Sequence, residues 1–264
     1  MAKKYNTVFT ESISDYVLLV TLDRPQQANA LNTEMATELL DLWSSLYQNP
    51  VKLRSIVLTG KGNRVFCAGA DLKERKTMSN DTWEKQHRLF EQMILAMVNC
   101  PIPIIAAVNG AAFAGGLEIA LACDFIYASD KSRFAFTEVS IGIMPGAGGT
   151  QNLPRAVGIR RAKEIILTGK PFDGQQALSW GLVNQLFPLE DLIFQSIEAA
   201  QSISENAPIA TRQAKKSIDA SSWSDFKTGY DFEVALYNKL IGTHDQLEGV
   251  ASFNEKRKPR FIGS

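Results

Sequence analysis

Short, mainly apolar segments alternate with amphipathic helices through the first half of the chain, and this alternation constrains the fold more than any other feature. The segments 53–58, 104–108 and 124–128 are rich in apolar side chains, as is typical of strands buried on both faces. Helices that begin at Thr33 and Asn80 are predicted before and between these strands, because capping residues precede apolar residues at helical spacing. The pattern predicts an α/β fold whose sheet is covered on both faces.

The two ends of the chain differ in their patterns. Val8–Phe9 and Tyr16–Leu22 are apolar, β-branched segments on either side of a polar turn over 11–15, which predicts an opening hairpin. Beyond Leu189 the pattern is helical throughout. The expected helices there are 191–204, 209–218, 224–241 and 246–255. We therefore predict an α/β core over residues 1–190 that carries the active site and a helical region over residues 191–264, with a soft boundary inside one functional unit.

The charge balance argues against nucleic acid and membranes as partners. Lys plus Arg and Asp plus Glu both total 28, so the formal net charge is zero and no long-range field favours polyanions. The helix predicted from Thr33 contains Glu34, Glu38 and Asp41 but no basic residue, so it lacks the electrostatic footprint of an RNA-binding surface. No run approaches the ~18 uncharged apolar residues of a membrane span. We expect neither a nucleic-acid nor a membrane partner.

The three cysteines indicate a reducing compartment. Cys67, Cys100 and Cys123 are odd in number and widely spaced, with no C-x-x-C pair and no histidines placed to complete a zinc site. The first residues also lack the apolar core of a signal peptide. We expect a cytoplasmic protein without a metal site.

Three segments concentrate small residues beside groups that could perform chemistry: Phe66–Glu74, Asn109–Asp124 and Phe134–Thr150. In the second, Gly115 opens a helix, where free N–H groups and the helix dipole favour developing negative charge. In the first, the backbone around Ala70 could present a second N–H in the same way. Two N–H groups that converge on one oxygen form an oxyanion hole, which would stabilise the enolate formed when water attacks an unsaturated thioester.

Two carboxyl groups could divide the acid and base roles that such a hydration needs. Glu118 lies one turn inside the helix that Gly115 opens, and Glu138 lies in the otherwise apolar stretch 134–143, where burial would raise its pKa. One ionised and one neutral carboxyl group can then act as base and acid. Taken alone, each glutamate could instead be an ordinary surface or paired carboxylate.

Other features nearby admit simpler interpretations. The glycine-rich segment Pro145–Thr150 lacks the Lys-Ser/Thr of a phosphate-binding loop, so we expect it to shape an active-site loop. Cys67 has no histidine partner in view, so a small buried apolar role is favoured over a nucleophile. His87 could lie at the acyl pocket or on the surface. The basic residues Lys256, Arg257, Lys258 and Arg260 near the C-terminus are either a solvated tail or a contact to substrate phosphates.

Over essentially its whole length the chain resembles the enoyl-CoA hydratase/isomerase (crotonase) superfamily. The segments that carry the resemblance are LDRPQQANALN from Leu22, FCAGADLKE from Phe66, GGLEIALACD from Gly115, TEVSIGIMPGAGGTQNLPRAVG from Thr137, LTG from Leu167 and EKRKPRF from Glu255. The resemblance implies a spiral of ββα turns with a helical, oligomerising C-terminal region, a homotrimer or dimer of trimers, and no metal or redox cofactor, since coenzyme A is part of the substrate.

The resemblance also implies roles for individual residues. The N–H groups of Ala70 and Gly115 would form the oxyanion hole, and Glu118 and Glu138 would hold the water and exchange its protons. The stretch that binds the CoA thioester would comprise Ala68, Ala70, Asp71, Leu72 and Lys73, with Arg24 as a further candidate. Members that hydrate double bonds keep both glutamates, which favours enoyl-CoA hydration here, with methylglutaconyl-CoA as one candidate substrate. An isomerase or other acyl-CoA thioester enzyme, or a non-enzymatic acyl-CoA or RNA-binding module, stays open.

Overall fold

Two sheets built mostly from parallel strands form the core of the protein, whose computed structural model describes residues 4–50 and 52–264. The larger sheet has the order β1-β2-β3-β5-β7-β10, and all of its neighbours are parallel except β1 and β2. The smaller sheet has the order β4-β6-β8-β9, with β9 antiparallel to β8. The larger sheet comprises β1 (Val8–Ser12), β2 (Val17–Leu22), β3 (Ser55–Gly60), β5 (Ile104–Val108), β7 (Phe125–Ser129) and β10 (Gln185–Phe187). The smaller sheet comprises β4 (Val65–Cys67), β6 (Ala111–Phe113), β8 (Arg133–Ala135) and β9 (Phe172–Asp173).

Each turn of the chain places one strand in each sheet. The pairs β3 and β4, β5 and β6, and β7 and β8 are consecutive in sequence, yet the first member of each lies in the larger sheet and the second in the smaller. Helical segments follow these pairs. The predicted α/β spiral of ββα turns with helices at the C-terminal end is confirmed.

Helices flank the sheets, and those for which the sequence predicted a range begin and end within a few residues of it. The first group is α1 (Thr33–Gln48), α2 (Leu72–Arg75), α3 (Asn80–Val98), α4 (Gly115–Leu121), α5 (Gly149–Val157), α6 (Ile159–Thr168) and α7 (Gly174–Ser179), with the 3-10 helices η1 (Pro25–Gln27) and η2 (Glu138–Ile141). The second group is α8 (Leu189–Ser204), α9 (Pro208–Ser221), α10 (Phe226–Asn238) and α11 (His244–Glu255). At α1 the Asn32 side chain accepts a hydrogen bond from the Met35 N–H, as the sequence led us to expect of a capping residue.

Both faces of the larger sheet are buried, as the apolar strands predict. Along β3, Ile56 and Leu58 point into the main core beside α1 and α3, whereas Val57 points into a second cluster. That second cluster is completed by Leu192 and Ala200 of α8. The alternation follows from the two-residue period of a strand.

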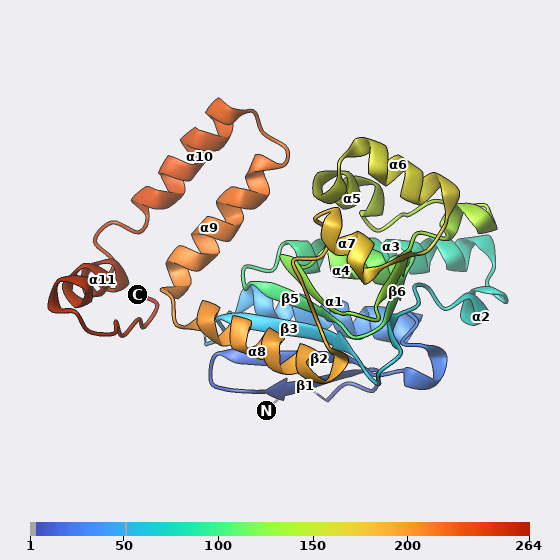
Figure 1. Cartoon of the computed structure of the whole chain (residues 1–264), viewed down its shortest axis with the longest axis horizontal. Helices are drawn as coiled ribbons and strands as arrows, with labels where there is room; N and C mark the ends of the chain where they lie inside the picture. The colour runs from blue at the N-terminus through green and yellow to red at the C-terminus, as the bar shows by residue number, and fades with distance from the viewer. Residues whose placement is uncertain (1–3, 51) are drawn as a thin grey trace.

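The helix α8 therefore packs with the sheet, although it begins at the predicted boundary near residue 190. Figure 1 shows that the helices after it, α9, α10 and α11, extend away from the sheets. The division into residues 1–190 and 191–264 stays a prediction, and the packing of α8 associates that one helix with the core.

Two sequence-based bounds were wrong by a few residues. The strand predicted over 53–58 is 55–60, because its pairing with β2 runs from Ser55 to Gly60. The strand β1 continues through Glu11 and Ser12, which we had assigned to the polar turn, because both pair with β2. Neither change affects the placement of the candidate catalytic groups.

Candidate active site

A cavity of about 540 Å³ lies where α2, α3, the start of α4 and η2 meet the end of β4. Its lining includes Ala68, Ala70, Gly115, Glu118 and Glu138. The three small-residue segments that the sequence singled out are therefore brought together, although lining residues such as Ala68 and Ala147 are 79 positions apart.

The backbone around Ala70 and Gly115 comes close together in this cavity. A β-carbon placed on Gly69 would lie 3.1 Å from the Gly115 nitrogen, and one placed on Gly115 would lie 3.8 Å from the Ala70 nitrogen. The pairing with Leu31 uses the Gly69 carbonyl and the Asp71 N–H, so the N–H between them is directed away from that partner. The Gly115 N–H starts α4 and has no carbonyl one turn before it inside the helix. The two N–H groups lie near one another and are candidates for an oxyanion hole.

A strained residue precedes the second of these N–H groups. Ala114 has φ 50° and ψ −125°, a conformation that residues with a β-carbon rarely adopt. Its N–H donates to the Ala135 carbonyl at 2.8 Å, which fixes the turn from β6 into α4. Such strain persists only where the surrounding structure determines it, and it is concentrated at functional sites.

Glu118 is held by the backbone of the loop after η2. Its Oε1 accepts hydrogen bonds from the Ala147 N–H at 2.7 Å and the Gly149 N–H at 2.8 Å, and the residue is only 4% exposed. Burial raises the pKa of Glu118 above its ordinary value, while these two donors and His87 oppose that rise. The carboxyl group is fixed in position by bonds that favour its ionised form.

Glu138 occupies a different electrostatic environment. Burial raises its pKa to about 7, and the nearby charge of Glu118 adds to the effect. Its Oε2 is buried and, among residues 4–50 and 52–264, has no hydrogen-bond partner. The Glu118 carboxyl group is therefore anchored by two donors, whereas the pKa of Glu138 is raised. Such a difference makes them candidates for the base and the acid of a two-carboxyl mechanism.

The predicted thioester-binding residues divide into two sets. Ala68, Ala70, Leu72 and Gly115 line the cavity. Arg24, Asp71 and Lys73 are not part of its lining.

The side chains of Arg24 and Asp71 bind one another rather than the cavity. Their Nη2 and Oδ2 atoms lie 3.0 Å apart, and Asp71 also caps α2 by accepting from the Lys73 and Glu74 N–H groups. Burial acts against the charge of Asp71, but the hydrogen bonds from Arg24 and the backbone outweigh it and lower its pKa. This ion pair joins η1 to the start of α2 and so supports the backbone that carries Ala70.

The side chains that close the cavity were mostly missed by sequence reasoning. Arg75 of α2 and Trp83, His87, Phe90 and Ile94 of α3 form one wall. The four α3 residues recur at spacings of four and three, so the sequence indicates that they share one face of the helix. It does not indicate that this face lines a cavity. The glycine-rich segment contributes Pro145, Gly146 and Ala147, which confirms that it shapes the site.

The thiol of Cys67, which directly follows Phe66 in β4, is fully buried beside the cavity. Burial raises the pKa of Cys67 to about 12, so the thiol stays protonated at neutral pH. The small buried role expected for this residue is confirmed.

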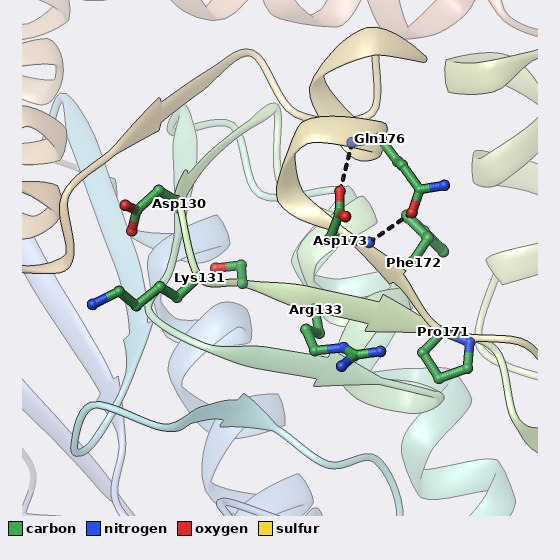
Figure 2. A pocket seen from close by; sticks show the side chains of 8 residues that line it. Asp130, Lys131, Arg133, Pro171, Phe172, Asp173 and Gln176 are labelled. Carbon is green, nitrogen blue, oxygen red and sulfur yellow. Dashed lines mark hydrogen bonds between the residues drawn. The ribbon is translucent and has the colours of Figure 1, made fainter.

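A second hollow, of about 280 Å³, lies beside β8 and β9 and lacks a comparable set of groups. Figure 2 shows the reciprocal hydrogen bonds there between Asp173 and Gln176, which form a capping box at the start of α7. The Asp130 carboxylate accepts from the Ser129 hydroxyl. The carboxylates of Asp130 and Asp173 are therefore engaged in local structure. Across the described residues, no helix is long and apolar enough to cross a membrane and no cluster of residues could ligate a metal.

Comparison with known proteins agrees with this geometry. The model of a family described as enoyl-CoA hydratase/isomerase matches residues 12–264. A Bacillus subtilis protein named as a candidate enoyl-CoA hydratase/isomerase, YngF, is 41% identical over 250 residues, 95% of this chain and 96% of its own. A short-chain-enoyl-CoA hydratase from Clostridium acetobutylicum is 38% identical over 242 residues, 92% of each chain.

Solved structures extend the likeness to three dimensions. The crystal structure of an enoyl-CoA hydratase from Bacillus anthracis superposes with a TM-score of 0.96 at 38% identity, covering 98% of this chain and 100% of that one. With a family model that spans nearly the whole sequence and relatives of this similarity, the chain belongs to the enoyl-CoA hydratase/isomerase family.

Proposed function

We propose that this enzyme adds water across the 2,3-double bond of an enoyl-CoA thioester. One observation carries the proposal: two free N–H groups and two unlike carboxyl groups surround a single cavity. The thioester oxygen accepts hydrogen bonds from the Ala70 and Gly115 N–H groups, which polarises the double bond and stabilises the enolate. Removing one such donor costs ~3–4 kcal/mol of transition-state stabilisation in comparable sites.

The two glutamates then take opposite parts. Glu118, anchored by two N–H groups, is the ionised base that removes a proton from water as the oxygen attacks the β-carbon. Glu138, whose pKa is raised to about 7, is the acid that protonates the α-carbon. The reaction leaves Glu118 protonated and Glu138 ionised, and exchange of one proton with solvent restores the starting state.

The thioester-binding segment, the substrate and the cellular compartment can be proposed on the same basis. The backbone from Ala68 to Leu72 receives the CoA thioester, and the four groups above supply the chemistry without a metal or redox cofactor. The similarity of FCAGADLKER to methylglutaconyl-CoA hydratases makes that thioester one candidate substrate. Three buried, unpaired cysteines fit a reducing compartment, and we propose the cytoplasm.

We also propose that the protein assembles as a homotrimer or a dimer of trimers. Its C-terminal region from α9 to α11 carries many large apolar side chains that are exposed in the single chain, which is typical of surfaces covered by a partner. They are Ile218, Trp223, Phe226, Tyr230, Val234, Tyr237, Ile241, Leu247, Val250 and Phe253.

Substitution of the two glutamates tests the reaction. We expect Glu118→Gln and Glu138→Gln each to lower kcat for hydration of crotonyl-CoA by ~10²-fold or more, because each removes one acid–base group. The loss of absorbance of the conjugated thioester measures the rate. Glu84→Gln, at an exposed site on α3, is the matched control and should keep wild-type activity. Wild-type protein that moves the double bond without adding water would support an isomerase instead, and CoA binding without turnover would support a binding module.

A further inference from the structure

The cavity contains one cation that the proposed hydration does not use. Arg75 lines it and is 7% exposed, although arginine is almost never buried without a partner. Among residues 4–50 and 52–264, no carboxylate oxygen lies within 4.0 Å of its guanidinium nitrogens. The site therefore holds a buried positive charge beside walls that are otherwise largely apolar.

The guanidinium group is fixed rather than free to swing away. Its Nε donates to Gln86 Oε1 at 2.8 Å, and its Cζ lies 4.6 Å from the ring centroid of Trp83 and 5.3 Å from that of Phe90. Gln86 is itself held, because its Nε2 donates to Thr33 Oγ1 and Glu74 Oε2. The orientation of Arg75 is set by packing and by a second layer of hydrogen bonds.

The nearest acidic residue is already committed to other donors. The Glu74 carboxylate accepts from the Thr33 N–H and from the Gln86 amide, so it balances the charge of Arg75 only from a distance. Burial lowers the pKa of Arg75, and the charge of Glu74 opposes the effect. Within the described chain, no hydrogen bond engages the two terminal nitrogens of Arg75, whereas the side chain lines the cavity.

We propose that Arg75 is a specificity-determining residue that binds a carboxylate at the far end of the acyl group, so that the preferred substrates are enoyl-CoA thioesters of dicarboxylic acids. The inference rests on the proposed function, because it places the thioester at Ala70 and Gly115. A carboxylate matches the fork of two terminal guanidinium nitrogens, and it removes the cost of an unpaired buried charge. A neutral acyl chain offers the two terminal nitrogens no such partner.

A pair of thioesters that differ only in the terminal group provides the test. Glutaryl-CoA and pentanoyl-CoA have acyl chains of equal length, and only the first ends in a carboxylate. We expect wild-type protein to bind glutaryl-CoA about 10- to 100-fold more tightly by calorimetry, the range typical of a charge-assisted hydrogen-bond pair. Equal affinities, or tighter binding of pentanoyl-CoA, would overturn the inference.

Turnover separates this inference from the proposed function. Wild-type protein should hydrate glutaconyl-CoA with a kcat/KM at least 10-fold above that of pent-2-enoyl-CoA. Hydration of both substrates at equal efficiency would overturn the role of Arg75 and leave the proposed function intact. Hydration of neither, with glutaryl-CoA still bound more tightly than pentanoyl-CoA, would overturn the proposed function and support the carboxylate site.

Variants assign the preference to the side chain. Arg75→Met should reduce kcat/KM for glutaconyl-CoA at least 10-fold more than for pent-2-enoyl-CoA, and Arg75→Lys should keep part of the preference because the charge remains. Lys76→Met removes the neighbouring charge at an exposed residue outside the cavity lining and should change neither. An equal loss for both thioesters in a folded Arg75→Met protein would place Arg75 at the CoA moiety and overturn the inference. If that variant does not fold, the wild-type comparison decides.

Discussion

The difference in proton affinity between the two glutamates has a measurable consequence. Glu138 must carry a proton to act as the acid, and its pKa in the free protein is raised to about 7. We therefore predict that kcat/KM for hydration falls about tenfold per unit above this pH, as the acid form is lost, and falls again at low pH, where the Glu118 base becomes protonated. Rates across pH 5 to 9 measure the profile. In Glu138→Gln the descending limb should be absent from the residual activity, and its persistence would assign the limb to another group.

The glycine that holds Glu118 offers a second test at the same scale. A β-carbon on Gly149 would lie 2.9 Å from Glu118 Oε1 and 2.7 Å from a ring carbon of Phe136. Gly149→Ala should displace the carboxylate, lower kcat by one to two orders of magnitude and destabilise the fold by ~1–3 kcal/mol. Gly249→Ala is the control, because its added carbon meets Phe261 only at 3.6 Å. Wild-type turnover in Gly149→Ala would show that the base needs no such anchoring.

The sequence was sufficient to predict the candidate catalytic residues, but not the backbone groups that hold them in position. Glu118, Glu138 and Gly115 could be singled out because a carboxyl group in an apolar stretch or a glycine at a helix start is a local feature. The N–H groups of Ala147 and Gly149 could not, since any residue type supplies an N–H and only the fold decides where it points. The role of Arg75 could not be predicted for a similar reason. It lies in the charged run 73–76, and nothing in the sequence of that run indicates that Arg75 is the buried residue.

At the level of elements, the packing of α4 on β4 sets the position of the candidate base. A β-carbon on Gly116 would lie 2.0 Å from the Cys67 carbonyl oxygen, which is backbone and cannot move aside. Gly116→Ala should destabilise the protein by ~3 kcal/mol or more, measured by urea unfolding. On Gly115 the nearest atoms to an added carbon are at 3.6 Å, so Gly115→Ala is the matched variant and should unfold at nearly the wild-type urea concentration. Similar losses in both would contradict this account.

The smaller sheet shows where prediction of elements ends. Its strands have two or three residues each, and the pairing of β4 with β6 joins segments more than 40 residues apart. So short a segment carries no measurable period, and Ala111–Phe113 follows an Asn-Gly turn signal with small residues of low strand preference. The central strands β2, β3, β5 and β7 of the larger sheet were predictable because burial on both faces demands continuous apolar side chains, whereas the short, partly exposed edge strand β10 was missed.

At the scale of the whole molecule, the exposed stripe on α10 predicts assembly. Phe226, Tyr230 and Val234 recur at intervals of four along one face, and Tyr237 continues it. We expect light scattering to give the mass of three or six chains, and Phe226→Glu together with Tyr230→Glu to reduce it, because both place a charge where a partner would pack. Lys227→Glu changes the charge at an exposed site off the stripe and should not alter the mass. A wild-type monomer would contradict the prediction.

The helices of this region were predictable one by one, but their arrangement was not. Patterns placed all four within a few residues, whereas nothing in them indicated that α8 packs under the sheet while α9 to α11 extend outward. The position of α8 depends on the packing of Leu192 and Ala200 against apolar residues such as Ile105 and Ala107, which lie more than 80 positions earlier in the chain.

Because the three thiols are buried, their rates of chemical modification can measure local unfolding of the protein. Cys67 lies beneath Gly116 at the contact between β4 and α4, and Cys100 and Cys123 follow α3 and α4. An alkylating reagent can reach the fully buried Cys67 sulfur only in those molecules where the contact between β4 and α4 has opened. The rate at which Cys67 is modified therefore reports how often the helix carrying the base separates from its strand.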